Sequence, residues 1–304
     1  MRSTDLQLDV AAATGLDEPV HVAGTLHLPD GEAAGGRLDL LLALHGGGYR
    51  RSYWHPPFDN AYSFARFFTD RGKAVLALDH LGMGDSTKPE PESRLSRAAI
   101  AAANAEALAQ VVAGLTGGRL GQAGAVSVTG VGHSIGGMMV VTQAAAHGGM
   151  DRVAVLGWAN QPMVLGGTDA ATLAAMLPPH GYLPTPREPM RALFYLPDVS
   201  REIVEADEAL AGETPSCLGR DALTPGIVHA AAAAIAAPVL VVHGEVDTSP
   251  DPWGEPAYFR RSRDVTLHVV AGSAHCHNLA STRRDHWARL DRWIVATPAI
   301  TSSS

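Results

Sequence analysis

The amino-acid sequence predicts an α/β fold built on a mostly parallel β-sheet. The first observation is a series of near-continuous apolar runs, as expected for parallel strands that are covered on both faces. The second is that helix-like segments alternate with these runs along the chain, which is the pattern of α/β proteins. The apolar runs lie at residues 38–48, 73–82, 125–134, 152–160, 237–247 and 264–275.

Two further strands are expected at the N-terminus. Residues 6–12 and 20–29 alternate in polarity on either side of the turn-prone segment 14–19, which predicts an antiparallel pair at an edge of the sheet. Together with the apolar runs they make an eight-stranded sheet. Helices that flank this sheet are predicted at residues 58–71, 96–115, 135–147, 253–263 and 280–296.

One long interval does not follow the alternation of strands and helices. Residues 160–236 are rich in proline and large apolar side chains, and no strand signal interrupts them. We interpret this interval as a mainly helical cap that is inserted after the sixth predicted strand. Residues 1–159 and 237–304 then form the core domain.

The composition indicates a globular protein and limits the classes of partner that it can bind. The chain has 304 residues, of which 46% are hydrophobic and 18% are charged, so it is long and apolar enough to bury a large core. Its formal net charge of −8 is spread without long blocks of like charge, which argues against a nucleic-acid partner. The sequence leaves the oligomeric state open, a homo-oligomer included.

The N-terminal segment predicts a cytoplasmic protein with no membrane partner. It lacks a basic region followed by an apolar one, and it contains no run of about 18 apolar residues, so neither secretion nor membrane insertion is expected. The chain has two cysteines, Cys217 and Cys276, which are too few for a disulfide framework. Reduced thiols are the simpler expectation.

The most informative stretch is VSVTGVGHSIGGMMV at residues 126–140. A β-branched run precedes Ser134 and a helix-like run follows it, so the serine lies on a strand-to-helix turn in a GxSxG pattern. Small residues two positions before and after such a serine are needed, because side chains there would clash with the strand and the helix. The pattern predicts a nucleophilic serine close to the free N–H groups of a helix N-terminus.

A serine nucleophile needs a base, which in turn needs a carboxylate that orients it. Glu245, Asp247 and Asp251 lie at the end of one predicted strand, and His275 and His277 lie at the end of the next. The chain order serine, acid, histidine is the order that belongs to this kind of strand-to-helix turn. The spacing alone leaves the choice of acid and of base open.

Over almost its whole length the chain resembles the α/β-hydrolase fold family. The resemblance rests on motifs that resemble the family's oxyanion loop, the turn after the fourth strand, the nucleophile elbow, the acid turn and the histidine loop, in the family's order. These motifs are HGGG at 45–48, DHLGMGDS at 79–86, GHSIGG at 132–137, HGEVDTSP at 243–250 and AGSAHCHN at 271–278.

The resemblance implies a catalytic triad and an oxyanion hole. The implied triad consists of Ser134 as nucleophile, Asp247 as acid and His275 as base. Glu245 stays as the alternative acid and His277 as the alternative base.

The implied oxyanion hole is formed by backbone N–H groups of Ile135 and Gly47, with Gly48 as an additional donor to be considered. A serine at the elbow also argues against the family's dehalogenase and epoxide hydrolase branches, which carry aspartate there.

Other histidines and glycines have structural interpretations. We expect His45 to support the glycine loop through hydrogen bonds and His133 to pack between strands. A zinc site needs three or four convergent ligands, and around His275 and His277 only Cys276 could add one, so no metal is predicted. The sequence has neither GxxxxGK[ST] nor a helix that opens on GxGxxG, so no nucleotide cofactor is predicted either.

The predicted reaction is hydrolysis of a hydrophobic ester or lactone through an acyl-enzyme. More loosely, the chain resembles bacterial lactonases that open macrocyclic resorcylic lactones such as zearalenone. Two alternatives stay open: a carbon–carbon bond hydrolase with the same triad, and a non-catalytic ligand-binding member of the fold. The residues expected to line an apolar substrate pocket are Tyr49, Trp54, Trp158, Met163, Tyr182, Leu183, Phe194 and Tyr195.

Overall fold

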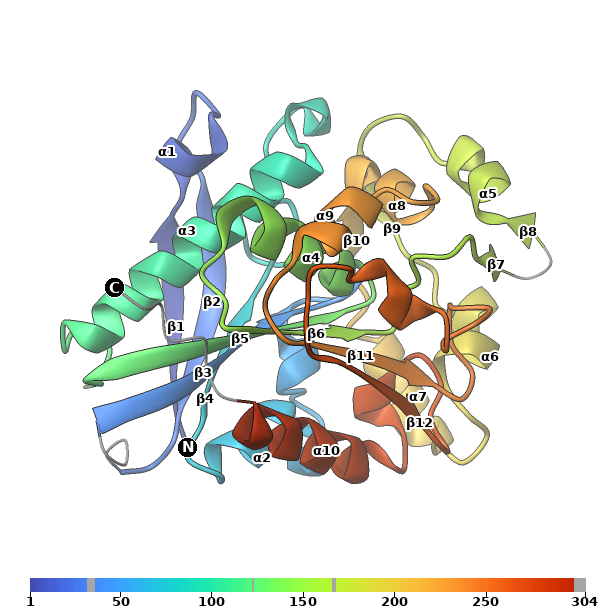
Figure 1. The fold of residues 1–304 in the computed structure, drawn as a ribbon. Helices are drawn as coiled ribbons and strands as arrows, with labels where there is room; N and C mark the ends of the chain where they lie inside the picture. Colours follow the sequence, from blue (N-terminus) through green and yellow to red (C-terminus); the bar gives the residue numbers. More distant parts are fainter. Residues whose placement is uncertain (32–35, 122, 166–167, 298–304) are drawn as a thin grey trace.

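An eight-stranded sheet forms the centre of the protein, in a computed structural model that describes residues 1–31, 36–121, 123–165 and 168–297 (Figure 1). The strands lie side by side in the order β1-β2-β4-β3-β5-β6-β11-β12. Their bounds are β1 (Arg2–Asp9), β2 (His21–Leu28), β3 (Arg37–Leu44), β4 (Ala74–Leu78), β5 (Ala125–His133), β6 (Arg152–Leu156), β11 (Val239–Gly244) and β12 (Val265–Val270).

The direction of the strands confirms the predicted mostly parallel sheet. β1 pairs antiparallel with β2, from Arg2 opposite Leu28 to Asp9 opposite His21, and β2 pairs antiparallel with β4. All other neighbours in this sheet are parallel. Parallel strands place their carboxyl ends at the same edge of the sheet, where this fold class carries its ligand sites.

Helices cover both faces of the sheet (Figure 1). On one face lie α3 (Arg97–Thr116) and α4 (Ile135–His147), which pack against each other. On the other lie α2 (Phe64–Thr69) and α10 (Arg283–Ala296). A single turn, α1 (Ala11–Thr14), connects β1 and β2.

The prediction of a helix over residues 253–263 is wrong. That segment forms only one 3-10 turn, Glu255–Tyr258, and at Phe259 (φ −88°, ψ 60°) the chain leaves the helical region. Gly254 and Pro256 are the reason, because glycine and proline are the two weakest helix formers.

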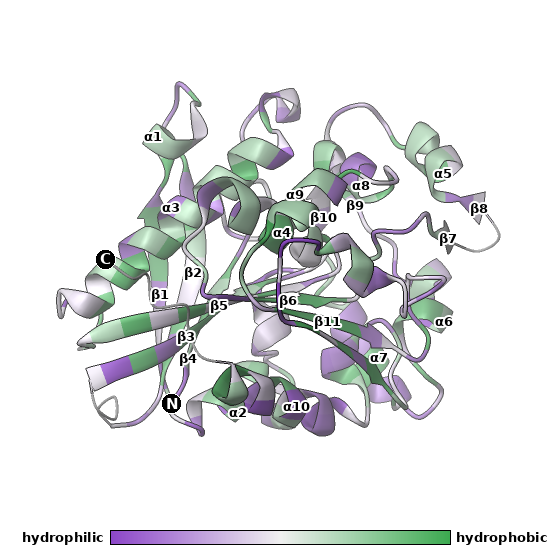
Figure 2. Cartoon of the chain, in the orientation of Figure 1, coloured by the Kyte–Doolittle hydropathy of each residue, from purple (hydrophilic) through white to green (hydrophobic). Residues whose placement is uncertain are grey.

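Each face of the sheet has its own hydrophobic core. Successive side chains of a strand point to opposite faces, so Leu40 and Leu42 join the cluster under α3 and α4, whereas Leu41 packs with Phe64 and Trp287 on the other face. Figure 2 shows the hydrophobic residues gathered on the central strands and α4, while α7 (Arg201–Glu208) and α10 carry many hydrophilic ones.

Among the described residues, one helix is long and apolar enough to cross a membrane. This helix is α3, with a mean hydropathy of 1.4, and half of the tested stretch is buried inside the protein. Its buried positions, such as Ile100, Ala103, Ala107 and Val111, recur at helical spacing and face the sheet and α4. Such a helix is what a covered sheet requires, so its hydropathy is weak support for membrane insertion.

The interval between β6 and β11 holds the cap elements, which lie at the right of Figure 1, beside the carboxyl ends of the parallel strands. It contains mostly helices, but also two two-stranded sheets that the sequence did not signal, because strands of two or three residues are too short to show alternation. The elements are β7 (Val164–Leu165), β8 (Thr168–Asp169), α5 (Ala170–Met176), β9 (Tyr182–Pro184), α6 (Arg191–Phe194), α7, β10 (Glu213–Pro215), α8 (Ser216–Ala222) and α9 (His229–Ala234).

Candidate active site

Ser134 lies on the sharp turn between β5 and α4. Its backbone has φ 56° and ψ −121°, and among the described residues it alone has a positive φ without being glycine. A side chain held in that region stores strain, which persists only when the surroundings impose it and is typical of functional sites. The Ser134 N–H donates to the Leu156 carbonyl at 2.8 Å, which ties the turn to the end of β6.

Close backbone contacts explain the glycines around this serine. A Cβ atom at Gly132 would collide with the Gly136 carbonyl, and one at Gly136 would collide with the Leu44 carbonyl. At Gly137 a Cβ would lie 2.8 Å from the Cβ of Trp158. Strand, turn and helix therefore approach too closely for any side chain at these positions.

Asp247 contacts both histidines that the sequence offered as the base. His275 Nδ1 lies 2.6 Å from Asp247 Oδ1, and His277 Nε2 lies 2.9 Å from Asp247 Oδ2. The N–H groups of Gly244 and Thr248 also donate to this carboxylate, each at 2.7 Å. Asp247 is thus held on both oxygen atoms in an orientation that leaves little freedom.

The electrostatics of this cluster favour an ionised Asp247. Burial by itself would raise the pKa of the carboxyl, but the nearby His275, the hydrogen bonds from His275 and His277, and His243 at 3.6 Å hold that pKa well below its usual range. Burial lowers the pKa of His277, which keeps this second histidine neutral. Glu245, the alternative acid, lies apart from both histidines: it is exposed and accepts the Gly272 N–H at 3.0 Å.

The two histidines differ in their relation to the cavity. His275 and Ser134 both line a cavity of about 270 Å³, whereas His277 is 1% exposed and does not reach it. With Nδ1 of His275 bound to Asp247, its Nε2 is the nitrogen left to act as a base. The geometry therefore favours His275 over His277 for that role.

Two backbone N–H groups beside Ser134 are free to bind an anion. Gly47 follows β3 and Ile135 begins α4, and in the part of the chain that the structure describes no acceptor takes the N–H of either. The third predicted donor behaves differently, because the Gly48 N–H donates to Thr214 Oγ1 at 2.7 Å. Gly47 and Ile135 are the pair that the geometry supports as an oxyanion hole.

The cap fixes the glycine loop from the other side. Arg187 Nη2 and the Gly212 N–H both donate to the Gly48 carbonyl, at 2.7 and 2.8 Å. The Arg187 guanidinium also lies over the Tyr49 ring, 3.6 Å from its centroid. Together with the bond to Thr214, these contacts leave the Gly48 peptide fully engaged by residues of the cap.

The histidine loop is held by the cap as well. The N–H groups of His275 and Cys276 donate to the carbonyls of Leu193 and Phe194, at 3.0 and 3.1 Å. His133, which was expected to be structural, supports the same loop: its Nε2 lies 2.8 Å from the His275 carbonyl and its ring stacks on Tyr53. Burial lowers the pKa of His133 well below the usual value, so this ring is neutral.

The cavity is lined mainly by apolar residues of the cap. Among the described lining residues none is Asp, Glu, Lys or Arg. The lining consists of Gly47, Ser134, Ile135, Gly157, Trp158, Met163, Leu177, Leu183, Pro184, Thr185, Pro186, Met190, Leu193, Phe194, Thr214, Gly219, Ala222, Leu223, Thr248 and His275.

Half of the aromatic and aliphatic residues expected to line the pocket do so, namely Trp158, Met163, Leu183 and Phe194. The expectation is not met for the other four, which have structural contacts instead. Tyr49 and Tyr195 both donate to the buried Asp207, Tyr182 donates to the Pro89 carbonyl, and Trp54 packs on Phe64 in the core.

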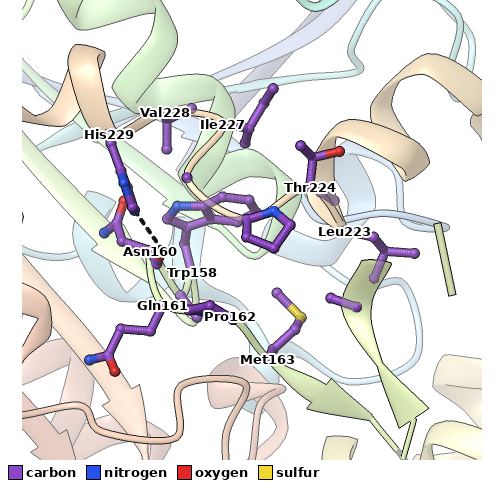
Figure 3. Close-up of a pocket in the computed structure, with 15 residues that line it drawn as sticks. Trp158, Asn160, Gln161, Pro162, Met163, Leu223, Thr224, Ile227, Val228 and His229 are labelled. Atoms are coloured by element: carbon purple, nitrogen blue, oxygen red, sulfur yellow. Dashed lines mark hydrogen bonds between the residues drawn. The ribbon is translucent and has the colours of Figure 1, made fainter. Parts of the chain in front are cut away.

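Behind Trp158 lies a second, nearly filled pocket of about 10 Å³, which has room for about one water molecule (Figure 3). It shares Trp158, Met163, Ala222 and Leu223 with the main cavity, so these residues form the wall between the two spaces. The dashed contact in Figure 3 joins His229 Nε2 to the Asn160 carbonyl at 2.8 Å. This contact holds the far side of the wall in place.

Several residues of the site carried no signal in the sequence. Thr214, Thr185 and Arg187 lie in the irregular interval of the cap. Thr214 and Arg187 bind Gly48, which is more than 130 residues away, and Thr185 binds Thr214. By contrast, His45 was expected from the sequence to support the glycine loop; it is buried there, with Nδ1 2.9 Å from the Gly46 carbonyl. Within the described ranges no group of three or more His, Cys, Asp or Glu side chains is arranged to hold a metal ion.

Comparison with known proteins agrees with the fold. The sequence pattern of the alpha/beta hydrolase family matches residues 41–289. A soluble variant of monoglyceride lipase from Saccharomyces cerevisiae superimposes with a TM-score of 0.72 at 14% identity, covering 98% of this chain and 96% of that one. Among curated proteins no sequence matches the chain.

Two further structures share the fold at similarly low identity. A thermophilic esterase from Thermogutta terrifontis has a TM-score of 0.65 at 15% identity, with 96% of this chain and 98% of that chain covered. The E-2-(acetamidomethylene)succinate hydrolase has a TM-score of 0.63 at 16% identity, with 97% and 100% covered. At such identities the comparison speaks for the fold and not for a substrate.

Proposed function

Because the chain belongs to the alpha/beta hydrolase family, we propose that it is a serine hydrolase that cleaves a carboxylic ester or lactone of a neutral, hydrophobic small molecule. One observation carries this proposal. Ser134, on the strained turn, and His275, bound to Asp247, line the same uncharged cavity next to the free N–H groups of Gly47 and Ile135.

The roles follow from these contacts. His275 takes the proton of Ser134 as the serine oxygen attacks the carbonyl carbon, and Asp247 orients and stabilises the imidazolium that forms. The N–H groups of Gly47 and Ile135 stabilise the tetrahedral oxyanion, and each such donor is worth about 2.7–4 kcal/mol in enzymes where one was removed. His275 then protonates the leaving alcohol, and water hydrolyses the acyl-enzyme by the same steps.

The lining of the cavity supports a neutral substrate. A bound carboxylate would need a cationic partner, because leaving a charge unpaired in an apolar site is costly, and no Lys or Arg side chain lines the described cavity. The E-2-(acetamidomethylene)succinate hydrolase, which shares the fold, is named for a dicarboxylate substrate. Such a substrate does not suit the cavity of this protein. A lactone suits it, because the acyl and alcohol parts of a lactone share one ring and one apolar cavity can hold both.

A labelling experiment paired with a substrate screen tests the proposal. A fluorophosphonate probe should label Ser134 stoichiometrically, and the wild type but not Ser134→Ala should hydrolyse aryl esters and lactones. Peptide mass spectrometry locates the adduct, and adduct formation on another serine would contradict the assignment. Labelling of Ser134 with turnover of diketones alone would favour the carbon–carbon hydrolase, and no labelling and no turnover would favour a non-catalytic binding protein.

A further inference from the structure

Two threonine hydroxyls face the otherwise apolar cavity. Thr185 and Thr214 both belong to the cap, and both line the cavity on the side of Gly47. Their Oγ1 atoms lie 3.2 Å apart, so one hydroxyl donates to the other. Thr214 Oγ1 also accepts the Gly48 N–H at 2.7 Å. The pair is therefore anchored to the glycine loop that carries the oxyanion donor.

Counting the protons of this pair shows that one of them has no acceptor. The two hydroxyls carry two protons, and the bond between the oxygen atoms uses one. The Gly48 N–H occupies a lone pair of Thr214 and takes up no hydroxyl proton. Among the described residues no other acceptor lies within hydrogen-bond distance of either hydroxyl. One O–H donor is left, whichever threonine carries it.

The other polar groups of the described lining do not offer such a donor. The indole Nε1–H of Trp158 also lacks a hydrogen-bond partner among the described residues, but this atom is fully buried and does not face the cavity. The third threonine of the lining, Thr248, donates its hydroxyl to the Gly157 carbonyl at 3.1 Å. Ser134 and His275 are committed to the chemistry. The spare proton of the threonine pair is thus the free donor, outside the reacting groups, that the described lining presents to a substrate.

We infer that Thr185 and Thr214 form a substrate subsite, which donates a hydrogen bond to a neutral acceptor oxygen close to the scissile carbonyl. Thr214 Oγ1 lies 3.4 Å from the position of a Cβ atom on Gly47, so the acceptor belongs within a few bonds of the carbonyl that binds the Gly47 N–H. The substrate class is an ester or lactone with an ether, hydroxyl or keto oxygen two or three bonds from its carbonyl carbon.

This subsite rests on the proposed ester hydrolysis and adds a selectivity to it. A substrate without the acceptor oxygen leaves the threonine donor buried and unpaired, and sites built around a hydrogen bond discriminate against such analogues. A neutral hydrogen bond of this kind corresponds to a preference of about threefold to tenfold.

Matched esters test the subsite. The 4-nitrophenyl esters of methoxyacetate and butanoate differ by an oxygen in place of a methylene, as do those of 3-methoxypropanoate and pentanoate. The ratio of kcat/KM within each pair is divided by the ratio of the alkaline hydrolysis rates, which removes the inductive effect of the oxygen. Wild-type enzyme should then prefer the oxygen ester of at least one pair by about threefold to tenfold.

Variants locate the preference. The double variant Thr185→Val/Thr214→Val keeps the shape of both side chains but has no hydroxyl, so the normalised preference should fall to one. Both rates should also fall, because the Gly48 N–H loses its acceptor. Thr185→Ser/Thr214→Ser and Thr248→Val are the controls: the first keeps both hydroxyls, and the second removes one whose proton is already used, so each should keep the preference.

The outcomes are distinguishable. A wild-type enzyme without oxygen preference, or a double valine variant that keeps it, contradicts the subsite while leaving ester hydrolysis in place. The oxygen preference of the wild-type enzyme tests the subsite even if the double variant does not fold. Failure of every ester with wild-type enzyme contradicts the proposed function instead.

Discussion

Asp247 accepts hydrogen bonds from two histidines, one on each carboxylate oxygen: His275 Nδ1 at 2.6 Å from Oδ1 and His277 Nε2 at 2.9 Å from Oδ2. His275 faces the cavity, and His277 lies behind it. We therefore propose that the second histidine supports the acid and does not act as a second base. This relationship leads to two predictions on the acid and its neighbours.

Asp247→Asn should lower kcat by about 10⁴-fold without loss of the fold, as replacement of the orienting carboxylate does in other triads. An asparagine has one acceptor oxygen, whereas two histidines donate to Asp247, so its NH₂ group must face one of them. Steady-state kinetics with an aryl ester measure the loss. Glu245→Gln is the matched control, and it should stay within a few-fold of wild type. Glu245 is exposed, and among the described residues it accepts a hydrogen bond only from the Gly272 N–H. A larger loss of kcat in Glu245→Gln than in Asp247→Asn would assign the role of the acid to Glu245.

His277→Ala should lower kcat by about tenfold to a hundredfold, the range expected when a charged group loses one hydrogen bond, with little change in KM. His275→Ala should be almost inactive, because it removes the base. His277→Gln tests the mechanism, since a side-chain amide also donates to Asp247 Oδ2 and should recover part of the rate. Equal inactivity of His275→Ala and His277→Ala would show that the division of roles is wrong.

Gly48→Ala should lower kcat by about one to two orders of magnitude through displacement of the glycine loop, since loss of an oxyanion donor costs about 10²–10³ in kcat. Gly48 has φ +65°, and a Cβ atom there would lie 2.5 Å from the Cβ of Thr185. Gly72→Ala is the control, because Gly72 has φ +76° with nothing within 4 Å of an added Cβ. Both variants carry backbone strain, so the melting temperature should fall in both. Only Gly48→Ala should also lower kcat, measured at a temperature where both variants are folded.

Phe194→Ala should harm long-chain and aromatic esters more than acetate. Phe194 lines the cavity, and each methylene buried there contributes about 0.8 kcal/mol. The kcat/KM of an ester series from acetate to octanoate measures the effect. Tyr195→Phe should leave the chain-length profile unchanged and lower the melting temperature, because the Tyr195 hydroxyl donates to the buried Asp207 at 2.6 Å. A flat profile in the wild type would remove the case for a hydrophobic substrate.

Acid should destabilise the protein through its buried neutral histidines. Burial lowers the pKa of His27 and His45 to about 4 and that of His80 to about 3, from an ordinary value of 6.5. Below pH 6.5 the unfolded chain binds protons that the folded protein does not, so the free energy of unfolding falls as the pH falls from 6.5 towards 4. Each of these histidines contributes about 1.4 kcal/mol per pH unit within that window.

His80→Gln tests this pH dependence. Urea unfolding of the variant between pH 6.5 and 4.5 should show a slope that is shallower by about 1.4 kcal/mol per pH unit, the share of one histidine. His147→Gln is the control, since His147 is exposed at the end of α4 and its replacement should not change the slope. An unchanged slope in His80→Gln would mean that the protonation of this histidine does not differ between the folded and unfolded states.

Features that depend on neighbouring residues in the chain were predictable from the sequence. The apolar runs indicated a parallel sheet, because buried strands need apolar side chains on both faces, and the glycines around Ser134 indicated the turn, because backbone contacts there exclude side chains. The helix over residues 253–263 was the local exception, since Gly254 and Pro256 outweighed its apolar pattern.

Features that join distant segments were decided by the tertiary structure. Phe194 and Tyr195 are adjacent aromatic residues, and both were expected to line the cavity. Phe194 lines it, whereas the Tyr195 hydroxyl donates to Asp207, because the two side chains point in different directions. Thr214 reaches the Gly48 N–H across 166 residues, and no local pattern encodes that bond. The sequence by itself determined the sheet, the turn and the order of the reacting groups, because periodicity and backbone sterics are local; the tertiary structure alone decided which cap residues meet them, because that depends on how the irregular cap packs against the loops.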